Sequence, residues 1–245
     1  MNQWAIVGHE WAVRQMRLAV ERDEVPHALL ITGPERIGKM TLARTVAKAM
    51  LCKGPSDDRP CGHCSACKRM ESGNYPDFMA IEPEDPARPS LKVDQIRALE
   101  RFLYLTPNES VYKIAIVSPF EVATISAANA LLKTLEEPPS YAHLILLASD
   151  AETLLPTIVS RTQQLALRPL DRGKIQRALM DRWHVSEQQA ERLARLSGGR
   201  LGWAVQAATD ATYLERMQTA LQTLFDLLDS DLPSRFDKAK PLAKD

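Results

Sequence analysis

The clearest indication of the fold comes from residues 27–51, HALLITGPERIGKMTLARTVAKAML. Its apolar segment 27–32 is typical of a buried strand, and the segment from Lys39 onward is typical of a helix. Between them lies G-x-x-x-x-G-K, a loop whose backbone N–H groups cradle phosphates while its lysine contacts their oxygens. Because the loop follows a strand and opens a helix, Gly33, Gly38 and Lys39 are candidate residues for binding ATP or ADP.

Two features of a working ATPase are absent from this pattern. Met40 stands where the motif needs serine or threonine, and a thioether is a poor ligand for Mg²⁺. Thr41 is rotated by about 100° around the helix from that position. The strand-like segment 113–117 is followed by Ser118-Pro119, where hydrolysis requires a carboxylate. We therefore expect no ATP hydrolysis by this chain alone, while nucleotide binding and a glycine turn kept for packing both stay open.

Strands and helices alternate along residues 1–170, which indicates an α/β domain with a parallel sheet covered on both faces. Four more strands are predicted at 77–83, 112–118, 142–149 and 162–170. Helices are predicted at 9–21, 92–105 and 123–137.

Strand signals stop at about residue 171. Three short helices at 173–184, 186–197 and 200–208 predict a small helical lid domain spanning 171–208. A further amphipathic helix is predicted at 211–230, within a last part that spans 209–245.

All four cysteines lie within residues 52–67, in the pattern C-x8-C-x2-C-x2-C. Thiolates at this spacing can converge on one tetrahedral site, so the sequence predicts structural Zn²⁺. A redox pair would leave two of the cysteines unexplained. The predicted metal ligands are Cys52, Cys61, Cys64 and Cys67.

Composition restricts the location and the partners of the chain. Lysine plus arginine equals aspartate plus glutamate at 31 each, so no global positive field favours wrapping nucleic acid. The first residues do not resemble a signal peptide, and no apolar run approaches the roughly 18 residues of a membrane span. We expect a cytoplasmic protein without membrane contact.

Arg161, in TIVSRTQ, lies after the third apolar strand, and we expect it between the α/β domain and its lid. An isolated arginine is most often a solvated surface charge.

Four features together resemble the bacterial clamp-loader group of the AAA+ superfamily. They are ANALLKTLEEPP at 128–139, the cysteine insert after the phosphate-loop helix, LLPTIVSR at 154–161 and the opening IVGHE. The match covers about residues 4–210 in the same order. This resemblance implies an AAA+ P-loop domain with a zinc module at about 52–67, a lid, and a helical collar domain of which 209–245 supply only the start.

The resemblance also implies a pentameric ring with gamma/tau motor subunits and a delta subunit. Such a ring opens the sliding clamp and places it on primer-template DNA. It would make this chain a subunit of the DNA polymerase III holoenzyme, without ATPase or polymerase activity of its own.

Departures from the motor pattern indicate the kind of member. Motor subunits have Lys-Thr in the phosphate loop, Asp-Glu after the second strand and an arginine in the lid. Here these positions hold Lys39-Met40, Ser118-Pro119 and Gly202. The resemblance therefore implies a rigid subunit that does not hydrolyse ATP.

Such a subunit contributes the arginine of a Ser-Arg-Cys motif to a neighbouring motor's ATP site. Ser160-Arg161 match that motif, and Thr162 replaces its cysteine. Arg161 is thus expected to act in catalysis in trans, as an arginine finger.

Two alternatives remain at this point. One is an active motor-type ATPase with an unusual Mg²⁺ shell that includes Glu121. The other is a zinc-dependent DNA-binding module, against which the neutral charge and the lack of a basic, aromatic-rich stretch near the cysteines argue.

Overall fold

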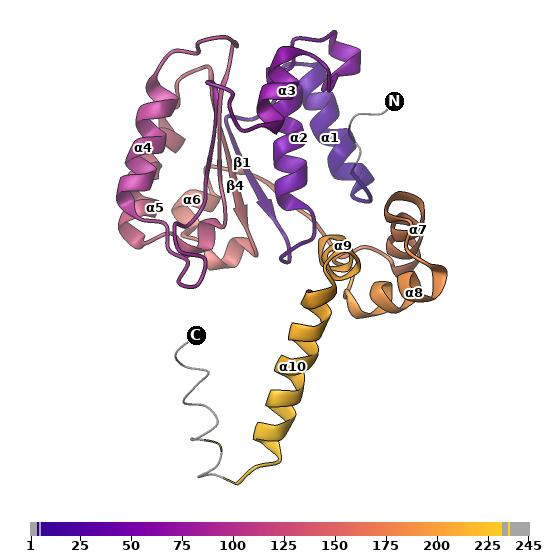
Figure 1. Cartoon of the computed structure of the whole chain (residues 1–245). Helices are drawn as coiled ribbons and strands as arrows, with labels where there is room; N and C mark the ends of the chain where they lie inside the picture. Colours follow the sequence, from indigo (N-terminus) through magenta and orange to yellow (C-terminus); the bar gives the residue numbers. More distant parts are fainter. Residues whose placement is uncertain (1–3, 5, 232–234, 236–245) are drawn as a thin grey trace.

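A single parallel sheet forms the centre of the computed structural model, which describes residues 4, 6–231 and 235 (Figure 1). Its five strands lie in the order β2-β3-β4-β1-β5, and every pair is parallel. The strands are β1 (Ala28–Thr32), β2 (Phe78–Ile81), β3 (Lys113–Val117), β4 (Ala142–Ala148) and β5 (Gln163–Ala166). All five predicted strands are confirmed. The strands β1, β3 and β4 are buried along their whole length, as continuous apolar runs require.

Two helical layers cover the two faces of the sheet (Figure 1). Successive strand residues point to opposite layers, so Leu29 and Ile31 join one core while Ala28 and Leu30 join the other. The first layer contains α1 (Glu10–Glu21), α2 (Lys39–Leu51) and α3 (Ser65–Glu71). The second layer contains α4 (Val93–Tyr104), α5 (Ile125–Glu136) and α6 (Pro156–Val159). Short 3-10 turns occur at Ser56–Asp58, Phe120–Val122 and Ala151–Thr153.

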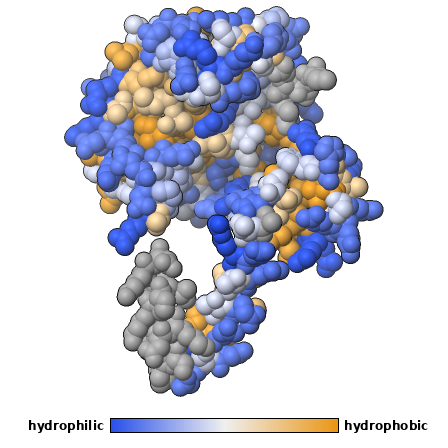
Figure 2. Space-filling model, viewed as in Figure 1, coloured by the Kyte–Doolittle hydropathy of each residue, from blue (hydrophilic) through white to orange (hydrophobic). Residues whose placement is uncertain are grey.

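The last helices form a separate apolar core. It is built from α7 (Arg172–Trp183), α8 (Glu187–Leu196) and α9 (Leu201–Thr209). Helix α10 (Ala211–Leu228) leaves this core and extends away from the sheet, as Figure 1 shows. Figure 2 shows hydrophobic residues at the surface over this helical part, where Leu196 and Phe225 are exposed. The predicted helices agree with α7 to α10, while most of the predicted collar segment after residue 231 lies outside the described residues.

One expectation about Arg161 is wrong. Strand β5 begins at Gln163 and pairs with β1, so Arg161 precedes an integral strand of the sheet. The residue therefore lies inside the α/β part and not between this part and the lid. In the described residues no helix has the length and apolarity needed to cross a membrane.

A buried ion pair fixes one end of the sheet near the cysteine insert. Asp77 and Lys113 are completely or almost completely buried, and Lys113 Nζ lies 3.4 Å from Asp77 Oδ1. The Asp77 carboxylate also accepts three backbone N–H bonds of 2.7 to 2.9 Å from residues 108–110. Glu109 in that loop forms ion pairs with Arg69 at 2.6 Å and Lys53 at 3.6 Å. The loop therefore joins the sheet to the cysteine insert.

Candidate functional site

The phosphate-type loop follows β1 and is held against the neighbouring strands. Gly33 N donates to the carbonyls of Ala148 and Ser149 at 3.2 and 3.1 Å. Gly33 has φ +143°, and a Cβ there would lie 2.7 Å from the Leu167 carbonyl oxygen. The glycine is thus needed because the chain after β1 passes closely between the ends of β4 and β5. Gly38 has φ +117° with open space around it, so its left-handed backbone alone favours glycine.

The lysine of the loop is engaged with the loop itself. Lys39 Nζ donates to the Gly33 carbonyl and, at 3.1 Å, to the Pro34 carbonyl. Burial lowers the pKa of Lys39, and the nearby carboxylates of Glu121 and Glu35 act in the opposite direction. Both carbonyl contacts use hydrogens that a phosphate group would otherwise receive. The structure brings Gly33, Gly38 and Lys39 into one loop and shows an ammonium group bonded to backbone oxygens.

The positions that would hold Mg²⁺ in a motor subunit have side chains that are not suited to bind this ion. Met40 packs against the apolar core of the first layer. Ser118 follows β3, and its N–H donates to Ile81 O at 3.0 Å. The first carboxylate after that strand, Glu121, accepts from Ser149 N at 2.9 Å through Oε1. Its other oxygen is buried without a hydrogen-bond partner among the described residues.

The lid packs directly on the phosphate-type loop. Gly202 N in α9 donates to Arg36 O at 2.8 Å, and a Cβ on Gly202 would lie 2.6 Å from that oxygen. The Arg36 side chain bonds Gln206 in α9 and lies 5.0 Å from the Tyr213 ring in α10. A cavity of about 260 Å³ remains beside this contact, with Thr41 in its wall. This volume is below the roughly 300 to 1,000 Å³ usual for ligand pockets.

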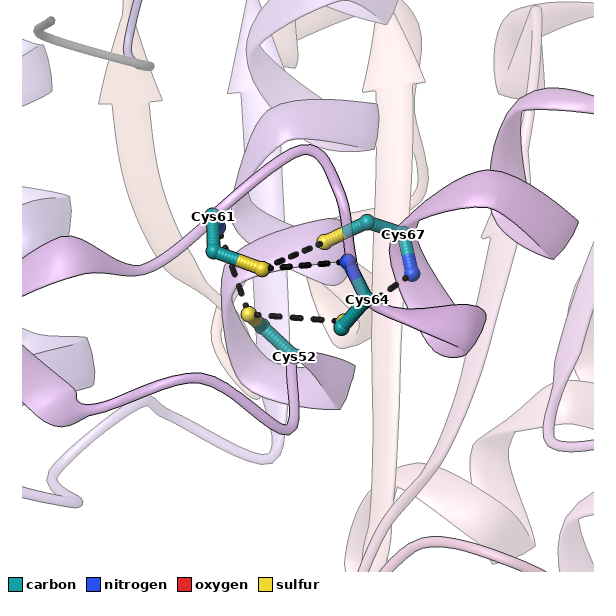
Figure 3. A group of neighbouring side chains, drawn as sticks. All are labelled: Cys52, Cys61, Cys64 and Cys67. Atoms are coloured by element: carbon teal, nitrogen blue, oxygen red, sulfur yellow. Dashed lines mark hydrogen bonds between the residues drawn. The ribbon is translucent and has the colours of Figure 1, made fainter.

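The four cysteines converge on one point (Figure 3). Their sulfur atoms all lie within 4.8 Å of one another. Cys52 Sγ lies 3.9 Å from Cys64 Sγ, and Cys61 Sγ lies 4.0 Å from Cys67 Sγ. Tetrahedral Zn–S bonds of about 2.3 Å place sulfur atoms about 3.8 Å apart. The cluster therefore fits a metal ion such as zinc, and the sequence prediction of a convergent four-cysteine group is confirmed.

Backbone N–H groups surround these sulfur atoms. Cys52 Sγ accepts from Gly54 N and Cys61 N at 3.3 Å each, and Cys64 Sγ accepts from Cys67 N at 3.4 Å. Burial acts to raise the pKa of Cys64, but backbone N–H bonds and neighbouring thiols outweigh it and hold the pKa at about 6. Burial raises the pKa of Cys52 and of Cys67. N–H groups of this kind stabilise the thiolates that a bound cation requires.

Arg161 is a half-exposed residue just beyond α6. Its Nη2 lies 2.6 Å from Oε1 of Glu136, the last residue of α5. Its Nη1 donates to the Thr157 carbonyl at 3.0 Å. The side chain borders an open groove of about 750 Å³ that His27 and Gln163 also line. The ion pair with Glu136 was not predicted, although Glu136 lies within the quoted stretch LLKTLEEPP.

The structure does not bring the phosphate-type loop and Arg161 together. The loop follows the end of β1, whereas Arg161 precedes the start of β5, and these strands are parallel neighbours. The two features therefore lie at opposite ends of these strands, separated by about five residues of strand or roughly 16 Å. Arg161 thus lies far from the loop of its own chain.

Comparisons with known proteins place this geometry in a family. The family model described as DNA polymerase III, delta subunit, matches residues 8–171. The DNA polymerase III subunit delta' of Pseudomonas aeruginosa is 39% identical over 183 residues, covering 73% of this chain and 54% of that protein. The subunit delta' of Bacillus subtilis is 37% identical over 193 residues, covering 77% and 57%. The chain thus spans about half the length of these relatives.

A solved structure shares the fold. The DNA polymerase III gamma subunit-related protein of Thermotoga maritima superposes with a TM-score of 0.53 at 21% identity, covering 93% of this chain and 77% of that one. This likeness supports the AAA+-like architecture alone. The family match covers most of the chain, and its residues include the loop, the four cysteines and Arg161. The chain therefore belongs to the DNA polymerase III delta-prime subunit family, in the clamp-loader group of AAA+ proteins.

Proposed function

We propose that this chain is a subunit of a replicative clamp loader that does not hydrolyse ATP and supplies Arg161 to the ATP site of a neighbouring motor subunit. In this proposal it assembles with gamma/tau and delta subunits in a cytoplasmic pentameric ring. The ring opens the sliding clamp and loads it on primed DNA. Membership of the delta-prime family supports this assignment.

One observation carries the proposal: the chain has a half-exposed arginine at one end of its strands, opposite to a phosphate-type loop that lacks the residues for hydrolysis. Lys39 is bonded to loop carbonyls, Met40 packs against the apolar core, and Ser118 offers no carboxylate. Arg161 is more than 15 Å away by the strand geometry, so the γ-phosphate that it contacts must belong to another chain. An arginine supplied in trans stabilises negative charge on the transferred phosphoryl group.

The cysteine cluster is assigned a structural role in the same proposal. Four thiolates complete the tetrahedral shell of Zn²⁺, so no position is left for a substrate or a catalytic water. The cluster would fix the insert between α2 and α3. The ion pairs of Glu109 with Arg69 and Lys53 then attach that insert to the sheet.

The test is ATP hydrolysis by the reconstituted complex in the presence of clamp and primed DNA. Arg161→Ala should lower the turnover that depends on this site by about 10³-fold or more, with the complex still assembled. Arg161→Lys should restore little, because an ammonium cannot reproduce the planar fork of donors. Arg17→Ala is a matched control, since Arg17 is also exposed and paired with a glutamate, at 2.8 Å.

Normal hydrolysis and clamp loading by an assembled Arg161→Ala complex would contradict the proposal. A loss of assembly with Arg161→Ala, without a comparable loss with Arg17→Ala, would show that Arg161 serves the interface and not the chemistry.

A further inference from the structure

The Glu136 carboxylate holds Arg161 from a different part of the chain. Arg161 Nη2 lies 2.6 Å from Glu136 Oε1. Glu136 is the last residue of α5, and Pro138-Pro139 follow directly after the helix. Glu136 thus lies at the end of α5, and its carboxylate contacts Arg161, which follows α6. This contact uses the stretch LLKTLEEPP, to which the proposed function gives no other role.

The guanidinium group of Arg161 is fixed at two points. Nη1 donates to the Thr157 carbonyl at 3.0 Å and lies 3.5 Å from Ser160 Oγ, while Nη2 pairs with Glu136. The backbone is held as well, because Arg161 N donates to Ile158 O at 3.1 Å. A guanidinium has five N–H donors, so donors remain for a phosphate after these contacts. The side chain is 36% exposed and yet has a defined orientation.

Fold stability does not account for a carboxylate at this position. The C-terminus of a helix carries partial negative charge, which disfavours a glutamate there. An ion pair as exposed as this one, with Glu136 50% exposed, adds little to stability. Glu137, one residue later, is also exposed, and its carboxylate forms no ion pair within the described part of the chain. The specific contact of Glu136 is therefore with Arg161.

We propose that Glu136 is a positioning residue, which holds the Arg161 guanidinium in the orientation that the neighbouring ATP site requires. This inference rests on the proposed function. A long arginine side chain that is free to rotate would have to be ordered in the transition state, whereas one already held in place is preorganised. Glu136 acts through Arg161 and does not touch the reacting phosphate.

The experiment measures steady-state ATP hydrolysis by the complex reconstituted with gamma/tau and delta subunits, clamp and primed DNA. Glu136→Ala should lower kcat by about tenfold, within the range that small misplacements of a catalytic group produce, and leave KM unchanged. Glu136→Gln should retain an intermediate kcat, because its amide oxygen still accepts from Nη2. Glu137→Ala, the matched control, should behave as the unmodified chain does.

A double variant separates positioning from a structural role. Glu136→Ala combined with Arg161→Ala should hydrolyse ATP at the rate of Arg161→Ala alone, since the effect of Glu136 passes through Arg161. The thermal unfolding of the Glu136→Ala chain should stay unchanged. A further loss of rate in the double variant would overturn the inference, because Glu136 would then act independently.

The remaining outcomes distinguish this inference from the proposed function. If Arg161→Ala lowers hydrolysis and Glu136→Ala does not, the positioning role is wrong while the trans role of Arg161 stands. If Glu136→Ala raises kcat, the carboxylate competes with phosphate for the arginine, and positioning is likewise wrong. If Arg161→Ala itself has no effect, the proposed function fails first.

Discussion

Removing the Asp77 carboxylate should destabilise the chain by about 4 kcal/mol, because it leaves a buried charge without a partner. The Lys113 side chain is only 2% exposed, and its ammonium lies 3.4 Å from Asp77 and 4.3 Å from the Phe102 ring centre. Breaking a buried ion pair from one side typically costs about 3 to 5 kcal/mol. Asp77→Ala also removes the acceptor of three N–H groups in residues 108–110. Residues 108 and 109 are exposed, so water can replace part of those bonds, and the charge dominates the loss.

The assay is thermal and urea unfolding followed by circular dichroism at pH 7. A loss of about 4 kcal/mol corresponds to a fall in Tm of roughly 8 to 16 °C for a chain of this size. Asp77→Ala with Lys113→Met should recover most of the stability, because no buried charge remains. Asp94→Ala, which removes an exposed carboxylate paired with Arg97 in the first turn of α4, is the control and should lower stability by no more than about 1 kcal/mol.

The same pair predicts how stability depends on pH. Burial acts to raise the pKa of Asp77, but the three N–H bonds and Lys113 outweigh it and hold the pKa below its ordinary value. A carboxyl whose pKa is lower in the folded state stabilises the fold above its unfolded pKa of about 3.9, and this stabilisation is lost as pH falls below that value. Asp77→Ala with Lys113→Met should therefore show a weaker acid dependence. A Tm loss below 2 °C for Asp77→Ala, or a double variant as unstable as the single one, would contradict this prediction.

The cysteine cluster, the phosphate-type loop and the contact of the lid can each be tested. Metal analysis of the purified chain should find about one equivalent of zinc. Cys64→Ser should lower the metal affinity and loosen the insert. A chain without metal and with four titratable thiols would contradict this prediction. The isolated chain should show no Mg²⁺-dependent ATP turnover, and steady turnover that disappears in Lys39→Ala would favour the motor alternative. Gly202→Ala should lower stability by about 1 to 3 kcal/mol, because its Cβ would lie 2.6 Å from the backbone oxygen of Arg36. Gly173→Ala is the control and should lower stability by less, because its Cβ would lie 3.1 Å from a side-chain oxygen of Asp171. Equal Tm values for both variants would exclude a tight contact of the lid.

The sheet and its main helices could be predicted because their signals are local. Continuous apolar runs at β1, β3 and β4 are typical of strands buried on both faces, and the cysteine spacing alone indicates a convergent group. Helix α3 was missed because its cap is unusual: Cys64 Sγ accepts from Cys67 N, in place of the serine, threonine, asparagine or aspartate oxygen that sequence patterns use. Helix α6 has only four residues, too few to show the repeat of apolar positions by which a helix is recognised in a sequence.

The contacts that define the candidate sites were not predictable, because they join residues far apart in the chain. Asp77 meets Lys113, and Arg36 meets Gly202, only after the strands and the lid have packed. The position of Arg161 was wrong for a related reason. The segment 162–170 was correctly expected to form a strand, but its pairing with β1, which places Arg161 inside the α/β part, depends on sheet order.

The ammonium group of Lys39 donates hydrogen bonds to carbonyls of the phosphate-type loop itself. The carbonyls of Gly33 and Pro34 accept two of the three ammonium hydrogens, so a phosphate that takes either of these two must displace a carbonyl. Its apparent affinity is the intrinsic affinity multiplied by the fraction of chains in which the ammonium is released. Each 1.4 kcal/mol by which the carbonyl-bonded form is favoured weakens apparent binding about tenfold. A nucleotide therefore gains from these two donors only to the extent that its phosphates bind them better than the two backbone oxygens do.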